Sequence, residues 1–278
     1  MRTAICLSGL ARTYRKAHKA FIHNVVGPLC KHGNVDIFIS IWDTMDLNLL
    51  ARNETAPCEA VDINEMVDMY HPVALDVERF DPLLAAFQLH RFTVKECPVS
   101  RIVRNGILCA MPAQYKIMRC NDLKHVYEQL NGFRYDLVIR TRLDFTISPL
   151  RVDEIDATKL NCLYDQDGLI GDYFYASNSE NIDKVTQLFN HYTVLLGIEG
   201  TDMGPERNLK NHVSRLGIET AIMRGYTFCL VKEKSDPSML GRLRRVVLGP
   251  TDTTEEFRWD EATKRYQAFD RVKGVFYK

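Results

Sequence analysis

The chain has 278 residues, of which 46% are hydrophobic and 26% are charged, values that are typical of a globular protein. Its 36 Lys and Arg residues are balanced by 36 Asp and Glu residues. This balance excludes a global basic charge that would attract nucleic acid or an acidic membrane. Any anion-binding site must therefore be local.

The N-terminal sequence M-R-T-A-I-C-L-S-G-L contains an apolar run that is too short for a signal peptide. No apolar stretch approaches the roughly 18–20 residues that a membrane span requires. The eight cysteines are scattered and form no C-x-x-C pair. We therefore expect reduced thiols, a cytoplasmic location and no membrane span.

The first part of the chain has the pattern of a β-α-β unit, which favours a mainly parallel sheet with right-handed crossovers. The expected elements are a strand at 3–8, a tight turn at 9–13, a helix to about Val26, a strand at Asp36–Trp42, a helix with loops within 46–72 and a strand at 73–78.

The second part continues the alternation of helices and strands, and we predict one Rossmann-like α/β domain over residues 1–278. The expected elements are a helix at 112–131 ended by Gly132, a strand at 135–140, short strands at 160–164 and 172–176, a helix at 179–196 capped by Asn178 or Ser179, a helix at 205–216, strands at 219–224 and 226–231, and a hairpin after Thr251 that packs on the domain.

The turn L-S-G-L-A-R-T follows the first expected strand. A small residue and a glycine at this place let the backbone approach a ligand, and a following helix N-terminus favours phosphate. The sequence matches neither G-x-G-x-x-G nor G-x-x-x-x-G-K-[ST], so the usual dinucleotide and P-loop motifs are absent. The alternative is a plain strand-to-helix turn with Arg12 as a solvated surface charge.

The second strand ends in I-W-D-T. A carboxylate just beyond the carboxyl end of a strand is where α/β folds collect ligand-binding groups. Asp43 is thus either a ligand-binding residue or the cap of the next helix. Trp42 either stacks on a base or packs in the core.

The strongest signal is R-T-R-L-D, at the end of the strand Y-D-L-V-I. Arg140, Arg142 and Asp144 occupy alternate positions, which point to one side of an extended chain. Asp144 is a candidate ligand of a divalent cation, and Arg140 or Arg142 is a candidate partner of phosphate oxygens. The alternative is an internal ion pair, either of Arg142 with Asp144 or with an acidic residue on a helix.

Two further acidic patterns have a functional and a structural interpretation. The sequence D-Q-D-G, with Asp165 and Asp167, has the spacing of a metal-binding D-x-D but is also a good turn. In G-T-D-M-G-P-E-R-N-L, Asp202 and Glu206 flank a helix start. Each is a candidate general base, or a cap or first-turn acid of that helix.

The sequence lacks the signature motifs of several other enzyme classes. The eight histidines show no H-x-H or H-E-x-x-H spacing, which argues against a zinc enzyme. No G-x-S-x-G motif is present for a serine hydrolase. The R-L-R-R cluster at 242–245 is best interpreted as a solvated turn.

Six segments occur in a characteristic order: C-L-S-G-L-A-R-T, D-I-F-I-S-I-W-D, A-Q-Y-K-I-M-R-C-N-D-L, Y-D-L-V-I-R-T-R-L-D-F, G-D-Y-F-Y-A-S and P-E-R-N-L. This order resembles the small glycosyltransferases of the GT-A type found in bacteria and large DNA viruses, especially those of chloroviruses, which glycosylate their own capsid protein. The resemblance spans roughly residues 3–215.

The resemblance implies a nucleotide-sugar-binding half at about 1–145 and an acceptor-binding half at 146–278. It implies that Ser8, Gly9 and Arg12 line the nucleotide, that Asp43 lies near the base or ribose, and that Asp144 matches the last carboxylate of the metal-binding D-x-D. It also places Tyr115, Asn121 and Lys124 near the donor sugar or phosphates, Asp172 on the acceptor side, and the base at Glu206 or Asp202.

This chain departs from the family pattern at Arg142-Leu143-Asp144, where D-x-D is expected. A Mn²⁺ or Mg²⁺ cofactor would then lose one carboxylate: either Asp144 alone holds the ion with water and the diphosphate, or Arg142 partly replaces the ion. The implied activity is the transfer of a sugar, expected to be xylose, from a UDP-linked donor to a hydroxyl of a glycan or glycoprotein with inversion at the anomeric carbon. A viral origin would place it in the host cytoplasm. The alternatives are a non-catalytic nucleotide- or glycan-binding module and a sugar nucleotidyltransferase.

Overall fold

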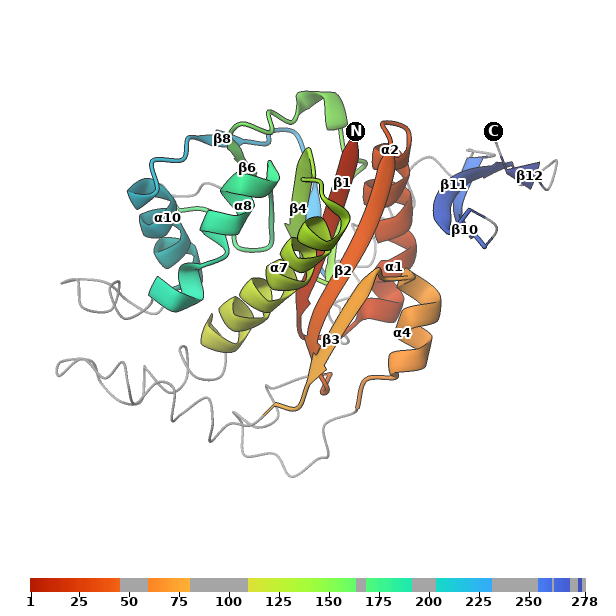
Figure 1. Ribbon diagram of the computed structural model, residues 1–278, viewed down its shortest axis with the longest axis horizontal. Coiled ribbons are helices and arrows are strands. Elements are labelled where there is room, and N and C mark those ends of the chain that lie inside the picture. Colours follow the sequence, from red (N-terminus) through yellow and green to blue (C-terminus); the bar gives the residue numbers. More distant parts are fainter. Residues whose placement is uncertain are drawn as a thin grey trace.

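The computed structural model describes residues 1–45, 60–80, 110–163, 169–191, 204–231, 255–261, 263–270 and 275–276. Its main feature is a seven-stranded sheet with helices on both faces (Figure 1). The strands lie in the order β3 (Ala74–Glu78), β2 (Asn34–Trp42), β1 (Arg2–Gly9), β4 (Leu137–Thr141), β7 (Phe174–Ser177), β6 (Leu160–Cys162) and β8 (Thr220–Ile222).

The sheet is mainly parallel. Strands β3, β2, β1 and β4 run in one direction, and β6 pairs with β8 in parallel. Only β7, among the strands of this sheet, runs antiparallel to its neighbours β4 and β6. The prediction of an α/β fold with a mainly parallel sheet is thus confirmed, and the arrangement is compatible with a Rossmann-like fold.

The central strands form because their sequences are nearly continuous apolar runs, as expected where both faces of a strand are covered. All five residues of β4 are buried, and so are six of the eight in β1. Such strands can only lie inside the sheet, which explains why β1 and β4 are neighbours at its centre.

Helices cover each face of the sheet with a separate core. One core packs Ile5 and Ile39 against the face formed by α1 (Tyr14–Phe21), a π-helical segment (Ile22–Val26), α2 (Gly27–Cys30) and α4 (Ile63–Tyr70). The other packs Cys6 and Val138 against α7 (Met111–Asn131), α8 (Ser179–Val185) and α10 (Pro205–Arg215). In Figure 1, α7 crosses one face of the sheet diagonally.

The C-terminal hairpin of β10 (Glu255–Asp260) and β11 (Arg265–Asp270), extended by β12 (Val275–Phe276), packs on the first of these faces, as predicted. The Trp259 ring stacks on His71 with centroids 4.4 Å apart. The Tyr266 hydroxyl donates to the Met69 carbonyl over 3.1 Å.

Several predicted boundaries shift. Helix α8 ends at Val185, where the Thr186 hydroxyl donates to the Ile182 carbonyl over 2.8 Å, a side-chain bond that competes with the helical pattern. Of the expected helix within 46–72, α4 is seen, and 46–59 lie outside the described residues. The strand predicted at 226–231 is present as β9 (Phe228–Leu230), whereas a 3₁₀ turn (Val152–Glu154), the strand β5 (Phe145–Ile147) and its antiparallel pairing with β9 are additions.

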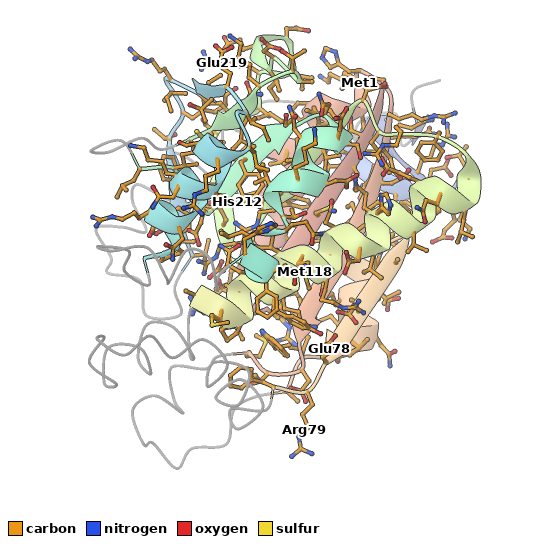
Figure 2. All side chains as sticks on the ribbon, turned by 60° about the vertical axis from the view of Figure 1, so that its left-hand side comes forward. Met1, Glu78, Arg79, Met118, His212 and Glu219 are labelled. Carbon is orange, nitrogen blue, oxygen red and sulfur yellow. The ribbon has the colours of Figure 1, made fainter. Side chains whose placement is uncertain are left out.

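The amino and carboxyl ends of the parallel strands lie at opposite edges of the sheet. Figure 2 shows Met1 at the edge where β1 begins, and Glu78 and Arg79 at the edge where β3 ends. Helix α7 begins near this carboxyl edge and runs back to Gly132, whose left-handed backbone (φ 66°) ends the helix. None of the described helices has the combination of length and apolarity that a bilayer crossing demands.

Candidate functional site

A cavity of about 170 Å³ lies at the carboxyl edge of the sheet. Its walls come from the ends of β1, β2 and β4, the residues just before β7, and the starts of α7 and α10. They are Ser8, Gly9, Leu10, Arg12, Trp42, Ala110, Pro112, Ala113, Arg140, Arg142, Asp172, Tyr173, Pro205 and Glu206. Seven residues predicted for the site are therefore together: Ser8, Gly9, Arg12, Arg140, Arg142, Asp172 and Glu206.

The position of this cavity follows from the strand order. From β1 the chain proceeds through β2 and β3 on one side, whereas β4 lies on the other side of β1. Loops leaving β1 and β4 therefore diverge, and a crevice forms between them at the carboxyl ends of the strands. Open α/β sheets bind their ligands at such a topological switch point.

The turn after β1 brings the backbone to the cavity. Gly9 has φ of 113°, a conformation that side chains with a Cβ rarely adopt, and Arg12 also has a positive φ of 25°. The Arg12 amide donates to the Met45 carbonyl over 3.1 Å, and the Thr13 hydroxyl donates to the Val231 carbonyl over 2.6 Å. These bonds hold the turn so that Arg12 faces the cavity.

Arg140, near the end of β4, is a buried cation with only 2% exposure. Among the described residues, its Nε and Nη1 atoms have no hydrogen-bond partner. Burial lowers the pKa of this guanidinium, and the charges of Tyr175 and Asp172 oppose that effect. The Cζ atom of Arg140 lies 5.6 Å from the centroid of the Tyr175 ring, a contact that leaves these N–H donors unsatisfied.

Arg142 is held by Asp144 in a two-point ion pair. Its Nε donates to Oδ1 of Asp144 over 2.8 Å and its Nη2 donates to Oδ2 over 2.7 Å. Arg12 Nη1 lies 3.5 Å from the same Oδ2. Burial lowers the pKa of Arg142, but the charge and hydrogen bonds of Asp144, together with the charges of Asp172 and Tyr173, outweigh burial, so the pKa is raised.

Other donors in the wall are also unpaired. The indole Nε1 of Trp42 and the hydroxyl of Ser8 are buried without a hydrogen-bond partner in the part of the chain that the structure describes. Trp42 stacks on Tyr115, with centroids 5.7 Å apart, and Lys116 Nζ lies 4.5 Å from its ring centroid. Tyr115 thus packs behind a wall of the cavity without lining it. Trp42 packs against its aromatic neighbours, as one of its two interpretations predicted, and it also lines the cavity.

Two carboxylates also line the cavity. Asp172, with 6% exposure, precedes β7; its charge opposes the lowering of the Arg140 pKa by burial and contributes to the raised pKa of Arg142. Glu206 is in the first turn of α10, after the N-cap Gly204 and Pro205. Asp202 and the D-Q-D sequence lie outside the described residues.

Asp43 is not among the residues that line the cavity. Its carboxylate accepts the backbone N–H of Phe80 over 3.2 Å, and its own N–H donates to the Glu78 carbonyl over 2.9 Å. Asp43 therefore ties the end of β2 to the end of β3, a structural contact at the same edge of the sheet.

Asn121 and Lys124 are also away from the cavity. Helix α7 runs from the carboxyl edge to the amino edge, and a helix rises about 1.5 Å per residue, so Lys124 lies roughly 18 Å further along the axis than Pro112. Asn121 and Lys124 instead donate to Oδ1 of Asp183 on α8, over 3.0 and 2.7 Å. Their side chains join two helices.

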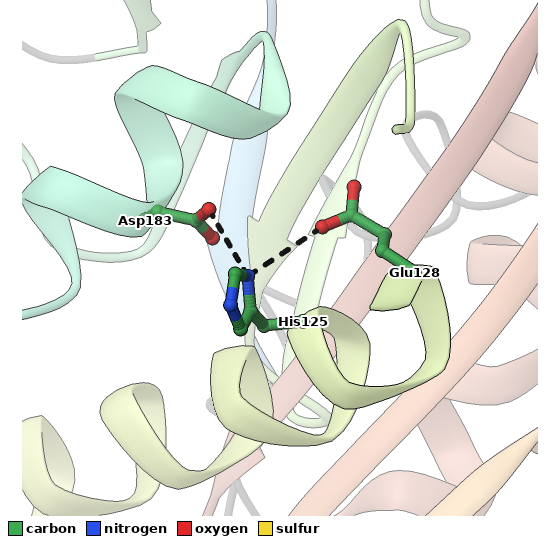
Figure 3. A group of neighbouring side chains, drawn as sticks. All are labelled: His125, Glu128 and Asp183. Atoms are coloured by element: carbon green, nitrogen blue, oxygen red, sulfur yellow. Dashed lines mark ion pairs between the residues drawn. The ribbon is translucent and has the colours of Figure 1, made fainter. Parts of the chain in front are cut away.

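The same helix pair contains a cluster with potential metal ligands, His125, Glu128 and Asp183 (Figure 3). Positively charged side chains of the protein already form ion pairs with these two carboxylates. Lys124 Nζ lies 3.1 Å from Glu128 Oε2, and Arg134 Nη2 lies 2.6 Å from Asp183 Oδ2. A buried Lys and an Arg would repel a metal ion, so we interpret this cluster as an ion-pair network that fixes α8 on α7.

The residues around Asp144 do not fit the divalent cation that the family resemblance implies. Both oxygens of its carboxylate already accept hydrogen bonds from Arg142, and Asp144 is only 1% exposed. A cation bound there would have to displace one guanidinium and would lie beside Arg12. Of the two interpretations of R-L-D, the structure contains the internal ion pair.

The sequence reasoning missed two parts of this edge. Tyr173 lines the cavity and lies under Arg142, whose Cζ is 5.6 Å from the ring centroid. Lys116, which is fully buried, pairs with Asp76 and Glu78 of β3 at 3.0 and 3.4 Å. The alternation of Asp76 and Glu78 on an apolar strand was the available signal, because both carboxylates must then face one helix.

No family model and no curated protein matches this chain. The function therefore has to be argued from the cavity. Its features are buried donors without partners, three guanidiniums and two carboxylates at a topological switch point.

Proposed function

We propose that the chain is a glycosyltransferase of the GT-A type, which transfers a sugar from a nucleotide diphosphate donor to a hydroxyl of a glycan or glycoprotein. The donor diphosphate would lie in the cavity between β1 and β4. A volume of about 170 Å³ is smaller than the roughly 300–1,000 Å³ of a site for a whole drug-sized ligand. We therefore assign the described walls to the diphosphate part of the donor.

The observation that carries this proposal is Arg140. Burying a cation without hydrogen-bond partners costs several kcal/mol, and Nε and Nη1 of Arg140 are in that state. An anion in the cavity offsets that cost, because phosphate oxygens accept strong charge-assisted hydrogen bonds from a guanidinium. Ser8 and Trp42 add unpaired neutral donors to the same walls.

The carboxylates supply the second half of the reaction. In our proposal Glu206 accepts the proton of the acceptor hydroxyl as its oxygen attacks the anomeric carbon. The bond from that carbon to the diphosphate oxygen breaks, and the electron pair leaves with the nucleoside diphosphate. The guanidiniums stabilise the charge that develops on the leaving group, while Asp172 is a nearby counter-charge to Arg140 and Arg142.

Finer points of the proposal derive from the resemblance to the chlorovirus enzymes. They are the UDP donor, xylose as the sugar, inversion at the anomeric carbon, a viral origin and a cytoplasmic location. We also propose the division into a donor half and an acceptor half: the turn after β1 supplies Arg12, β4 and the residue after it supply Arg140 and Arg142, and α10 supplies Glu206.

The test is a donor panel. The protein is incubated with UDP- and GDP-linked sugars, with and without glycan acceptors, and the released nucleoside diphosphate is measured. We expect release from one donor, most strongly from UDP-xylose, and we expect an acceptor to accelerate it. The control is Glu206→Gln, which should bind the same donor without this release.

Two other outcomes would assign a different function. Binding of nucleotide with no release from any donor, even with acceptors, would make the chain a binding module. Release of pyrophosphate from a nucleoside triphosphate plus a sugar phosphate would make it a nucleotidyltransferase.

A further inference from the structure

Asp144 is surrounded by guanidiniums. Arg142 binds both carboxylate oxygens, at 2.8 and 2.7 Å, and Arg12 Nη1 approaches one of them at 3.5 Å. The carboxylate lies beneath these two side chains with 1% exposure, and it is not one of the residues that line the cavity. A ligand in the cavity therefore meets Arg12 and Arg142 and not Asp144.

Asp144 instead determines how Arg142 is presented. Because Nε and Nη2 of Arg142 are held by the two carboxylate oxygens, the plane of the guanidinium is fixed, and its remaining N–H groups are directed away from Asp144. The guanidinium also lies over the ring of Tyr173, a second cavity residue. Such a preorganised cation loses little conformational freedom when it binds an anion.

Arg140 is a second cation of the cavity wall, and two of its hydrogen-bond donors, the buried Nε and Nη1, are unpaired among the described residues. In a site of low dielectric, a fixed guanidinium stabilises a negative charge much more strongly than it does in water. Divalent cations provide the same stabilisation in many phosphoryl-containing sites, so the arginines offer an alternative to a metal ion.

We infer that Arg12, Arg140 and Arg142 bind a diphosphate in this cavity without a divalent cation, and that Asp144 is a positioning residue and not a metal ligand. The identity of that diphosphate as the leaving group of a sugar donor rests on the proposed function. The inference itself concerns the anion and its counter-charges.

The experiment is isothermal titration calorimetry of inorganic pyrophosphate and of UDP into the full chain, first in EDTA and then in excess Mn²⁺. We expect both ligands to bind in EDTA, with affinities within about threefold of those in Mn²⁺ after correction for metal binding by the free ligand. Binding that requires Mn²⁺, or no binding of pyrophosphate in either buffer, would overturn the inference.

Asp144→Asn separates positioning from metal ligation. In our account the variant keeps its pyrophosphate affinity in EDTA within about tenfold, because the loss of orientation is offset by removal of a carboxylate that competes for Arg12 and Arg142. A metal ligand would behave differently: the wild type would need Mn²⁺ and the variant would not bind. Asp136→Asn, at the exposed opposite end of β4, is the matched control and should bind like the wild type.

The same titrations distinguish this inference from the proposed function. Pyrophosphate binding in EDTA together with no binding or turnover of any sugar nucleotide would uphold the arginine site and refute glycosyl transfer. Sugar transfer that occurs only with Mn²⁺ would refute the inference and leave the proposed function standing.

Discussion

Replacing Arg140 with methionine is expected to weaken the binding of UDP by about 100-fold or more while making the ligand-free protein more stable. The affinity falls because each charge-assisted hydrogen bond to the diphosphate contributes about 1.5–3 kcal/mol, and two donors of Arg140, a residue of the cavity wall, have no partner among the described residues. The free energy of unfolding should rise by about 1–3 kcal/mol, because a buried and unsatisfied cation is removed. Calorimetric titration and urea unfolding measure the two effects.

The opposite signs of the two effects are what identify a binding residue. If Arg140 were a structural cation, Arg140→Met would destabilise the protein and leave UDP affinity unchanged, and our assignment would be wrong. Arg2→Met is the matched control, since Arg2 lies at the other end of β1, over the ring of Phe133. It should lose a little stability and retain the affinity of the wild type.

The second large effect is expected for Glu206→Gln. Removing a general base should lower kcat by roughly 10²–10⁴-fold, with the affinity for the donor nearly unchanged, because glutamine preserves the shape of the first turn of α10. Steady-state kinetics with saturating acceptor and calorimetric titration of the donor separate the two quantities.

The control for this substitution is Glu219→Gln, which removes an exposed glutamate that pairs with Lys159 at 2.6 Å, away from the cavity. Its turnover should equal that of the wild type. Normal turnover in Glu206→Gln would contradict the assignment and transfer the role of the base to Asp172 or Asp202.

The sequence predicts those cavity residues that lie at the carboxyl ends of strands. Ser8, Gly9, Arg140 and Arg142 follow apolar runs that can only be buried parallel strands, and the carboxyl ends of such strands meet at one edge. Their convergence on one cavity therefore follows from residue spacing together with the β-α-β connection. The alternation in R-T-R-L-D also predicts the Arg142–Asp144 pair as one of two interpretations.

The parts that were not predicted depend on the direction of a helix and on pairings between distant segments. Because α7 leads directly into the start of β4, its last turns must lie at the amino edge, and this signal would have removed Asn121 and Lys124 from the site. By contrast, the contact of Asp43 with Phe80 and the pairing of β5 with β9 involve short segments far apart in the chain. No local pattern specifies such partners.

The most direct test of the central claim is a crystal structure of the protein with UDP bound. Our account predicts diphosphate oxygens within hydrogen-bond distance of Nε or Nη1 of Arg140, with Arg142 still paired to Asp144. Nucleotide bound elsewhere, for example in the cavity beside His71 and Trp259 at the opposite edge of the sheet, would contradict it.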